Sequence, residues 1–121
     1  MDSLRLKAKE LLESKSVDIV IGYEEGTKGV ARPVFITNPE NSAKIIYDER
    51  CIQNLAVYLT KAEVRKQGKM AIVATLPVMR SIMTLLSEKQ ITPDDFVVLG
   101  ISDKNELLDI ADIDEIGRAH V

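Results

Sequence analysis

Apolar residues recur along the chain with two different spacings, and the alternation between these spacings outlines a fold. Near the start, Leu4, Ala8, Leu11 and Leu12 fall at positions i, i+4, i+7 and i+8, with charged residues between them. This spacing places the apolar side chains on one face of a helix. We therefore expect an opening amphipathic helix that ends near Ser14.

Two β-rich runs follow, Val17–Tyr23 and Val34–Ile36. The segment between them, residues 24–29, is polar and contains two glycines, which is typical of a hairpin connection. An alternative interpretation is a phosphate cradle, but the segment lacks both the Walker spacing and the Gly-x-Gly-x-x-Gly order. Its adjacent acids, Glu24 and Glu25, are typical of a solvated turn. We predict an antiparallel hairpin.

The next stretch carries several helix-start signals. Asn38 followed by proline predicts a short helix running towards residue 45. Asp48 is placed to cap a second helix, because the apolar positions of 52–59 keep helical spacing. Residues 60–63 have the spacing of a capping box, so this second helix is expected to bend or restart there before Gly68 ends it.

The pattern of the last third of the chain predicts a parallel βαβ unit. Met70–Ala74 and Phe96–Ile101 are apolar runs of the kind buried in parallel sheets, and the segment between them has the period of an amphipathic helix with Pro77 in its first turn. Its predicted core stripe is Met79, Ile82, Met83 and Leu86. Residues 106–108 suggest a final short helix. The predicted fold class is α/β, one domain whose small mixed sheet joins a β-hairpin to a parallel βαβ unit, with Rossmann-like layering.

A parallel crossover places the loop after its first strand at the carboxyl edge of the sheet, where open α/β folds usually bind ligands. Here that loop runs from Ala74 to Pro77 and offers one hydroxyl, Thr75, but no acid, base or thiol. The sequence therefore locates a candidate site without naming a reaction.

Three further side chains are candidates for this site. Cys51 is the only cysteine, so it acts either as a small buried hydrophobe or, in an exposed electropositive niche, as a reactive thiol. Asn54 lies off the apolar stripe and turns its amide either to a ligand or to water. Arg80 stands near the start of the crossover helix, where a cation opposes the helix dipole, so it either binds an anion or pairs with an acid such as Glu88.

Composition narrows the function classes. The chain has 121 residues, 45% hydrophobic and 29% charged, with a net charge of −3 and basic residues interleaved with acidic ones. This balance disfavours nucleic-acid binding. No uninterrupted apolar run approaches the roughly 20 residues of a membrane helix, and the start lacks an apolar signal core. We expect a cytoplasmic protein without membrane insertion.

The last seven residues are interpreted separately. Back-translated with permitted codons, residues 115–121 spell a widely used sequencing-adapter oligonucleotide, which indicates read-through at the end of a sequenced fragment. The alternative is a natural polar tail. On the first interpretation the native domain is visible as residues 1–114, and the only histidine, His120, belongs to the artefact.

Two segments carry a family resemblance. Residues 50–59 match a Cys-x-x-Asn-Leu-Ala-x-Tyr-Leu element, and residues 69–101 match the strand, helix and strand that follow it. Together with the opening helix, the Val17–Tyr23 strand and residues 32–36, they make the chain similar to the beta-subunit family of the deazaflavin-coenzyme (coenzyme F420) hydrogenases and dehydrogenases. These are flavin and iron–sulfur electron-transfer proteins.

The chain departs from this family at one loop. Many members show Lys-Gly-Cys-Asp-x-Arg where this chain has residues 75–80, so only Arg80 is retained. Proline and valine neither ligate iron nor form side-chain hydrogen bonds there. The resemblance implies 4Fe-4S clusters, and FAD as a further cofactor, in the intact protein, but none is expected to be held by this segment alone, since a cluster needs about four thiolates.

The resemblance implies a role rather than a reaction for this segment. It predicts the amino-terminal part of a cytoplasmic oxidoreductase subunit that docks other subunits of a redox complex or lines a cofactor, with Cys51, Asn54, Thr75 and Arg80 as candidate cofactor-binding residues and no catalytic residue. Two alternatives remain open at this point. One is a non-catalytic subunit-interaction domain, and the other is a nucleotide-binding enzyme domain that uses the sheet edge near Thr75 and Ser102.

Overall fold

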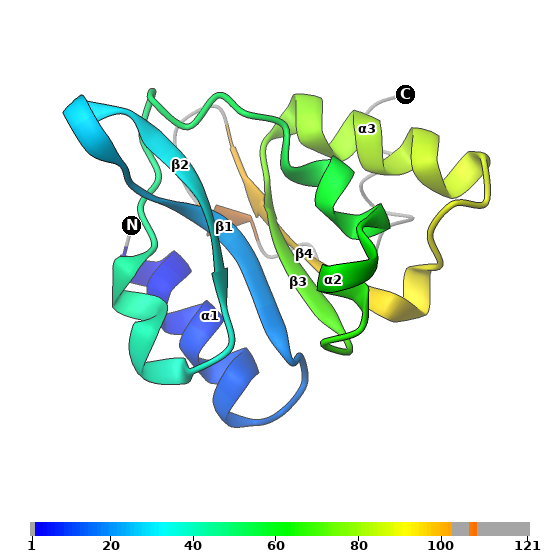
Figure 1. Ribbon diagram of the computed structural model, residues 1–121, viewed down its shortest axis with the longest axis horizontal. Helices are drawn as coiled ribbons and strands as arrows, with labels where there is room; N and C mark the ends of the chain where they lie inside the picture. The colour runs from blue at the N-terminus through cyan, green and yellow to red at the C-terminus, as the bar shows by residue number, and fades with distance from the viewer. Residues whose placement is uncertain (1, 103–106, 109–121) are drawn as a thin grey trace.

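The fold is built on one mixed sheet of five strands (Figure 1). The computed structural model describes residues 2–102 and 107–108, and the structural statements below concern these residues. Along the sheet the strands lie in the order β2-β1-β3-β4-β5. Their bounds are Ile19–Glu25 for β1, Ala31–Ile36 for β2, Met70–Ala74 for β3, Phe96–Ile101 for β4 and Leu107–Leu108 for β5.

The pairing confirms the predicted hairpin and the predicted parallel unit. β1 and β2 pair antiparallel around the short turn η1 (Thr27–Gly29), while β3 pairs parallel with both β1 and β4. Every residue of β3 is buried, as expected of a central strand covered on both faces. The α/β fold class is therefore confirmed.

Helical segments cover the sheet from two sides (Figure 1). On one side lie α1 (Asp2–Glu13) and η2 (Pro39–Lys44), and on the other lie η3 (Leu55–Thr60), α2 (Ala62–Arg65) and α3 (Leu76–Ser87). The predicted apolar stripe of α1 is buried at Leu4, Ala8 and Leu12. In α3 the stripe is buried at Met79 and Ile82, and the turn η4 (Pro93–Asp95) leads into β4.

Local capping explains the start of η2. The side chain of Asn38 accepts a hydrogen bond from the Glu40 amide at 3.0 Å, and Pro39 occupies the first helical position. This geometry satisfies one of the amides that the first turn leaves without a partner. The short helix predicted after Asn38 is confirmed, as a 3₁₀ helix.

Two predicted elements were wrong. No helix begins at Asp48, because its carboxylate accepts from the Arg50 amide at 2.9 Å and closes a tight turn instead. Helical structure starts only at Leu55, and Ile52, assigned to the apolar stripe, is 85% exposed. The helix predicted over residues 106–108 is also wrong at Leu107–Leu108, which pair with β4 as an antiparallel strand, while Glu106 lies outside the described residues.

The expected boundary at residue 114, the interpretation of residues 115–121 and His120 all fall outside the described part of the chain. Within that part, no helix is long and apolar enough to cross a membrane.

Gly68 is required by the entry into β3. It has φ +121, and a Cβ placed there would lie 2.2 Å from Asp18 Oδ2, the atom that accepts a hydrogen bond from the Lys69 amide at 2.9 Å. We predict that Gly68→Ala lowers the free energy of unfolding by about 2–3 kcal/mol, because strain and a displaced carboxylate add together. Urea denaturation measures this.

Gly29 is the matched control for this substitution. It also has a positive φ, +73, but a Cβ there meets nothing within 4 Å. Gly29→Ala is therefore expected to cost only about 1 kcal/mol. Equal losses for the two variants would contradict the role assigned to Asp18.

Candidate functional site

The carboxyl edge of the sheet is crossed by residues 45–54, here named the strap. β1 and β3 pair only as far as Ile21 and Ile72, and two residues later the Tyr23 carbonyl accepts a hydrogen bond from the Ile46 amide at 2.9 Å. The strap leaves η2 on one side of the sheet and enters η3 on the other. It thus lies at the edge where open α/β sheets usually bind ligands.

An aromatic cluster, formed by Tyr23 of β1 and Tyr47 of the strap, packs the strap against the sheet. The rings of Tyr23 and Tyr47 meet edge to face with centroids 6.2 Å apart. The Tyr23 hydroxyl donates a hydrogen bond to the Gln53 carbonyl, and burial raises the pKa of Tyr23. Both the backbone and the side chain of this one residue therefore hold the strap.

Cys51 lies inside this cluster rather than in an open niche. It is 5% exposed, and its Sγ lies 4.0 Å from the Ile46 carbonyl oxygen as a weak donor. Burial raises the pKa of the Cys51 thiol, although the nearby Arg50 opposes that shift. The structure therefore favours the buried, protonated form of Cys51 over a reactive thiolate.

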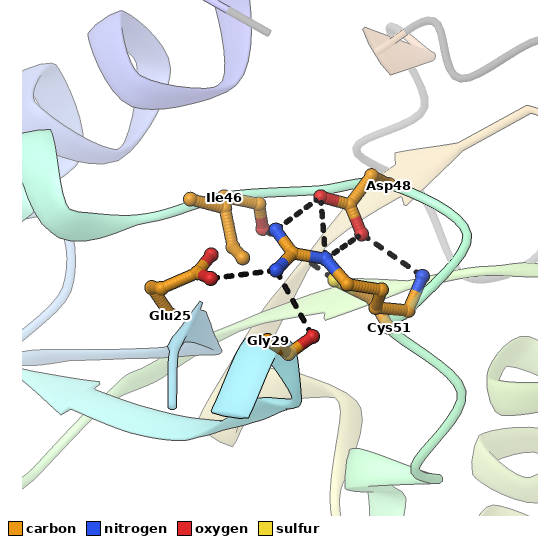
Figure 2. Close-up of polar contacts among 6 residues, drawn as sticks. Glu25, Gly29, Ile46, Asp48 and Cys51 are labelled. Carbon is orange, nitrogen blue, oxygen red and sulfur yellow. Dashed lines mark hydrogen bonds and ion pairs between the residues drawn. The ribbon is translucent and has the colours of Figure 1, made fainter. Parts of the chain in front are cut away.

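Arg50 fastens the strap to the hairpin through hydrogen bonds to Glu25 and Gly29, two residues labelled in Figure 2. Its guanidinium grips the Asp48 carboxylate, with Nη2 2.7 Å from Oδ2, while Nη1 reaches Glu25 Oε1 at 2.6 Å and the Gly29 carbonyl at 3.1 Å. Hydrogen bonds from Arg50 lower the pKa of Asp48 and of Glu25. Glu25, predicted to be merely solvated, thus has a structural partner.

Asn54 joins two helical elements. Its Oδ1 accepts from the Ala56 amide at 3.0 Å and caps η3, while its Nδ2 donates to Ser81 Oγ on α3 at 2.7 Å. The amide thus contacts another element of the chain, which neither predicted alternative, a ligand or water, included. No local pattern in the sequence indicates this contact, because 27 residues separate the two side chains.

The other two candidates lie on or next to α3. Thr75 is half-buried at the end of β3 and precedes α3 as its N-cap residue, but its side chain forms no capping hydrogen bond. Arg80 is exposed one residue before Ser81, and no ion pair with Glu88 occurs among the described residues. Asn54 thus touches the helix that carries Arg80, while Cys51 is a buried residue of the strap itself.

Exposed apolar side chains occur on the strap, on η3 and on α3. Ile52 is 85% exposed, Leu76 at the start of α3 is 45% exposed, and Val57 on η3 is 49% exposed. Across the described chain, no group of three or more histidine, cysteine, aspartate or glutamate residues is arranged to hold a metal ion. The edge offers contact surface and hydrogen bonds more than reactive groups.

Comparison with known proteins finds similarity among solved structures. No protein-family model matches the chain, and no curated protein matches it. Among solved structures, one chain of the F420-reducing [NiFe] hydrogenase complex from Methanosarcina barkeri, studied by xenon derivatization, superposes with a TM-score of 0.67. It is 18% identical, and the match covers 82% of this chain and 36% of that one.

This similarity shows a shared fold. The chain spans just over a third of the length of that relative. The predicted likeness to the hydrogenase family is thus supported at the level of architecture.

Loosening the strap should expose Cys51. We predict that Arg50→Gln accelerates modification of this thiol by Ellman's reagent several-fold, because the strap loses its contacts with the hairpin and opens locally more often. Removal of the positive charge alone would raise the thiol pKa and slow the reaction, so acceleration reports opening.

Arg32→Gln is the control, since Arg32 pairs with Glu24 on the same hairpin at 2.9 Å but does not touch the strap. A rate unchanged by Arg50→Gln, or raised equally by both variants, would show that Arg50 does not hold the strap closed.

Tyr23→Phe tests the hydroxyl contact. We predict a loss of about 1 kcal/mol at pH 7, the usual contribution of such a hydrogen bond. Because the folded pKa is raised above the unfolded value of about 10, stability from the neutral phenol is complete below pH 10 and falls as the pH rises further. The variant should therefore lose less stability than the wild type above pH 10.

Urea denaturation from pH 7 to 11 measures both effects. Tyr47→Phe is the matched control, because it keeps the ring contact and no hydrogen bond of its hydroxyl occurs in the described residues. It is expected to change stability at pH 7 by less than about 0.5 kcal/mol. Identical pH profiles for wild type and Tyr23→Phe would contradict the assignment.

Proposed function

We propose that this chain is the amino-terminal part of a cytoplasmic redox-complex subunit of the deazaflavin-coenzyme hydrogenase beta-subunit type, in which it docks other subunits or lines a cofactor. The observation that carries the proposal is the fold match to a chain of the F420-reducing hydrogenase complex over 82% of this chain. The family element recognised in residues 50–59 supports it, since these residues form the end of the strap and most of η3 at the carboxyl edge.

The described residues do not fit an iron–sulfur cluster. The chain has one cysteine, and its sulfur is buried against the Ile46 carbonyl. A cluster normally requires about four thiolates. In this proposal any 4Fe-4S cluster belongs to other parts of the intact protein, and FAD binding stays an expectation from the resemblance.

A docking role fits the surface beside the strap. Exposed apolar side chains, Ile52 above all, occur on the strap and on η3 and α3, the elements that the Asn54–Ser81 contact joins. Protein interfaces combine buried apolar anchors with hydrogen-bonding groups in this way. The proposed docking surface consists of Ile52, Val57 and Leu76.

A second candidate is a non-catalytic interaction domain. It is favoured by the first turn of α3, where Pro77 and Val78 replace residue types able to bind metal or donate protons. The nucleotide-binding alternative near Thr75 and Ser102 stays a prediction, because Tyr23 and Arg50 hold the strap at the end of β1, whereas Thr75 and Ser102 follow β3 and β4.

The full-length gene provides the test of the redox proposal. We predict that its product, purified without air, shows the visible absorbance of iron–sulfur clusters or flavin and co-purifies with other subunits, whereas the 121-residue chain alone is colourless. A colourless full-length protein that still binds its partners would support the interaction domain instead.

Substitution at the surface tests the docking role. Ile52→Asp should reduce the co-purified subunit at least about tenfold, since a charge replaces a central apolar anchor. Leu6→Asp is the control, because Leu6 is 66% exposed on α1, on the other side of the sheet. Equal recovery with both variants would place the interface elsewhere.

A further inference from the structure

β2 ends the sheet and leaves backbone groups open. β1 lies on one flank of β2, and no described strand lies on the other. The Gly26 amide donates to the Val30 carbonyl at 2.7 Å, which marks a hydrogen-bonded pair at the hairpin end. Because such pairs alternate in an antiparallel ladder, Pro33 and Phe35, opposite Tyr23 and Ile21, turn their backbone groups away from β1.

The open part of this edge is short. Ala31 is the next residue of β2 whose backbone groups point away from β1, but it is only 3% exposed. The accessible groups are therefore the Pro33 carbonyl and the amide and carbonyl of Phe35. Proline has no amide to leave unsatisfied at this edge, which suits an edge position. Three hydrogen-bonding groups therefore remain for an added strand.

A hollow of about 620 Å³ opens beside the same residue. The Phe35 ring is 41% exposed and meets Tyr58 edge to face, with centroids 5.0 Å apart. The apolar residues Ile19 and Val64 contribute to the lining, and polar side chains complete it. The remaining lining residues are Thr37, Lys61, Glu63 and Gln67.

The opposite face of the edge carries an arginine, Arg32. Arg32 alternates with Pro33 along β2 and so points to the other side of the sheet from Phe35. Its side chain is 59% exposed, and its ion pair in the described residues joins only Nε to Glu24, at 2.9 Å. An acidic side chain on an added strand would complement it.

We infer that this edge binds an extended segment of a partner subunit by strand addition, with aromatic side chains on the hollow face and acidic side chains on the Arg32 face. Backbone hydrogen bonds supply affinity in this mode, and side-chain pockets supply specificity. A second copy of the chain is less suited, because β2 has no acidic residue to offer to Arg32. The inference rests on the proposed role in a multi-subunit complex.

A peptide titration tests it on the 121-residue chain. The probe is the capped peptide Ser-Glu-Phe-Glu-Phe-Glu-Ser, whose alternation separates the phenylalanines from the glutamates when it is extended. We predict saturable amide shifts in ¹H–¹⁵N spectra at Phe35 and residues 61–67, with hydrogen exchange of the Phe35 amide slowed at least about tenfold in the complex.

Variants separate the two faces. Phe35→Ala should abolish saturable binding at the hollow, and Arg32→Gln should weaken binding about two- to fivefold, the range of an exposed ion pair. Lys9→Gln removes the same charge from α1, not from β2, and should leave the affinity unchanged.

Three results would overturn the inference. One is equal binding by a peptide N-methylated throughout its central residues, which cannot form the ladder. Another is equal binding by the peptide with lysine in place of glutamate. The third is peptide-free dimerisation through β2, which would make a second copy the occupant. Since the titration needs no cofactor or subunit, its failure is distinguishable from failure of the redox proposal.

Discussion

The separation of β1 from β3 at the carboxyl edge is the constraint on which the rest of the structure depends. Parallel pairing stops at Ile21 and Ile72, yet β1 continues to Glu25, so backbone groups beyond that point need another partner. The strap supplies it through the Ile46 amide. Because the strap must then cross to η3, it also determines where the hairpin, η3 and α3 meet.

In this arrangement a segment of the chain itself lies at the edge of the sheet where a ligand is expected. In open α/β sheets the crevice at the carboxyl ends of the strands usually receives a ligand. Here a segment of the chain, the strap, lies at that edge. The Tyr23 hydroxyl, the Arg50 ion pairs and the Asn54 amide hold it in place. The outer surface of the strap and the open flank of β2 are the surfaces proposed above for recognition.

The sequence predicted those elements whose signals are local. The α1 stripe, the hairpin, the Asn38 cap and the parallel βαβ unit depend on spacings within one or two turns or strands, and they are present. The spacing of Leu55, Ala56 and Leu59 does not show where the helix starts, because they keep this spacing in η3 although the preceding strap begins with a turn at Asp48. The deciding bond, from Arg50 to Glu25, spans 25 residues and leaves no periodic trace.

The same distinction explains the candidate site. Its location followed from topology, since a parallel crossover fixes which edge Thr75 occupies. The roles of the individual residues did not follow from the sequence. A cysteine or an asparagine is the same residue whether it lies in a reactive site or in a buried structural contact. Burial decides for Cys51, and a partner on α3 decides for Asn54. At this edge the polar groups of Tyr23, Arg50 and Asn54 thus bond to the protein's own chain.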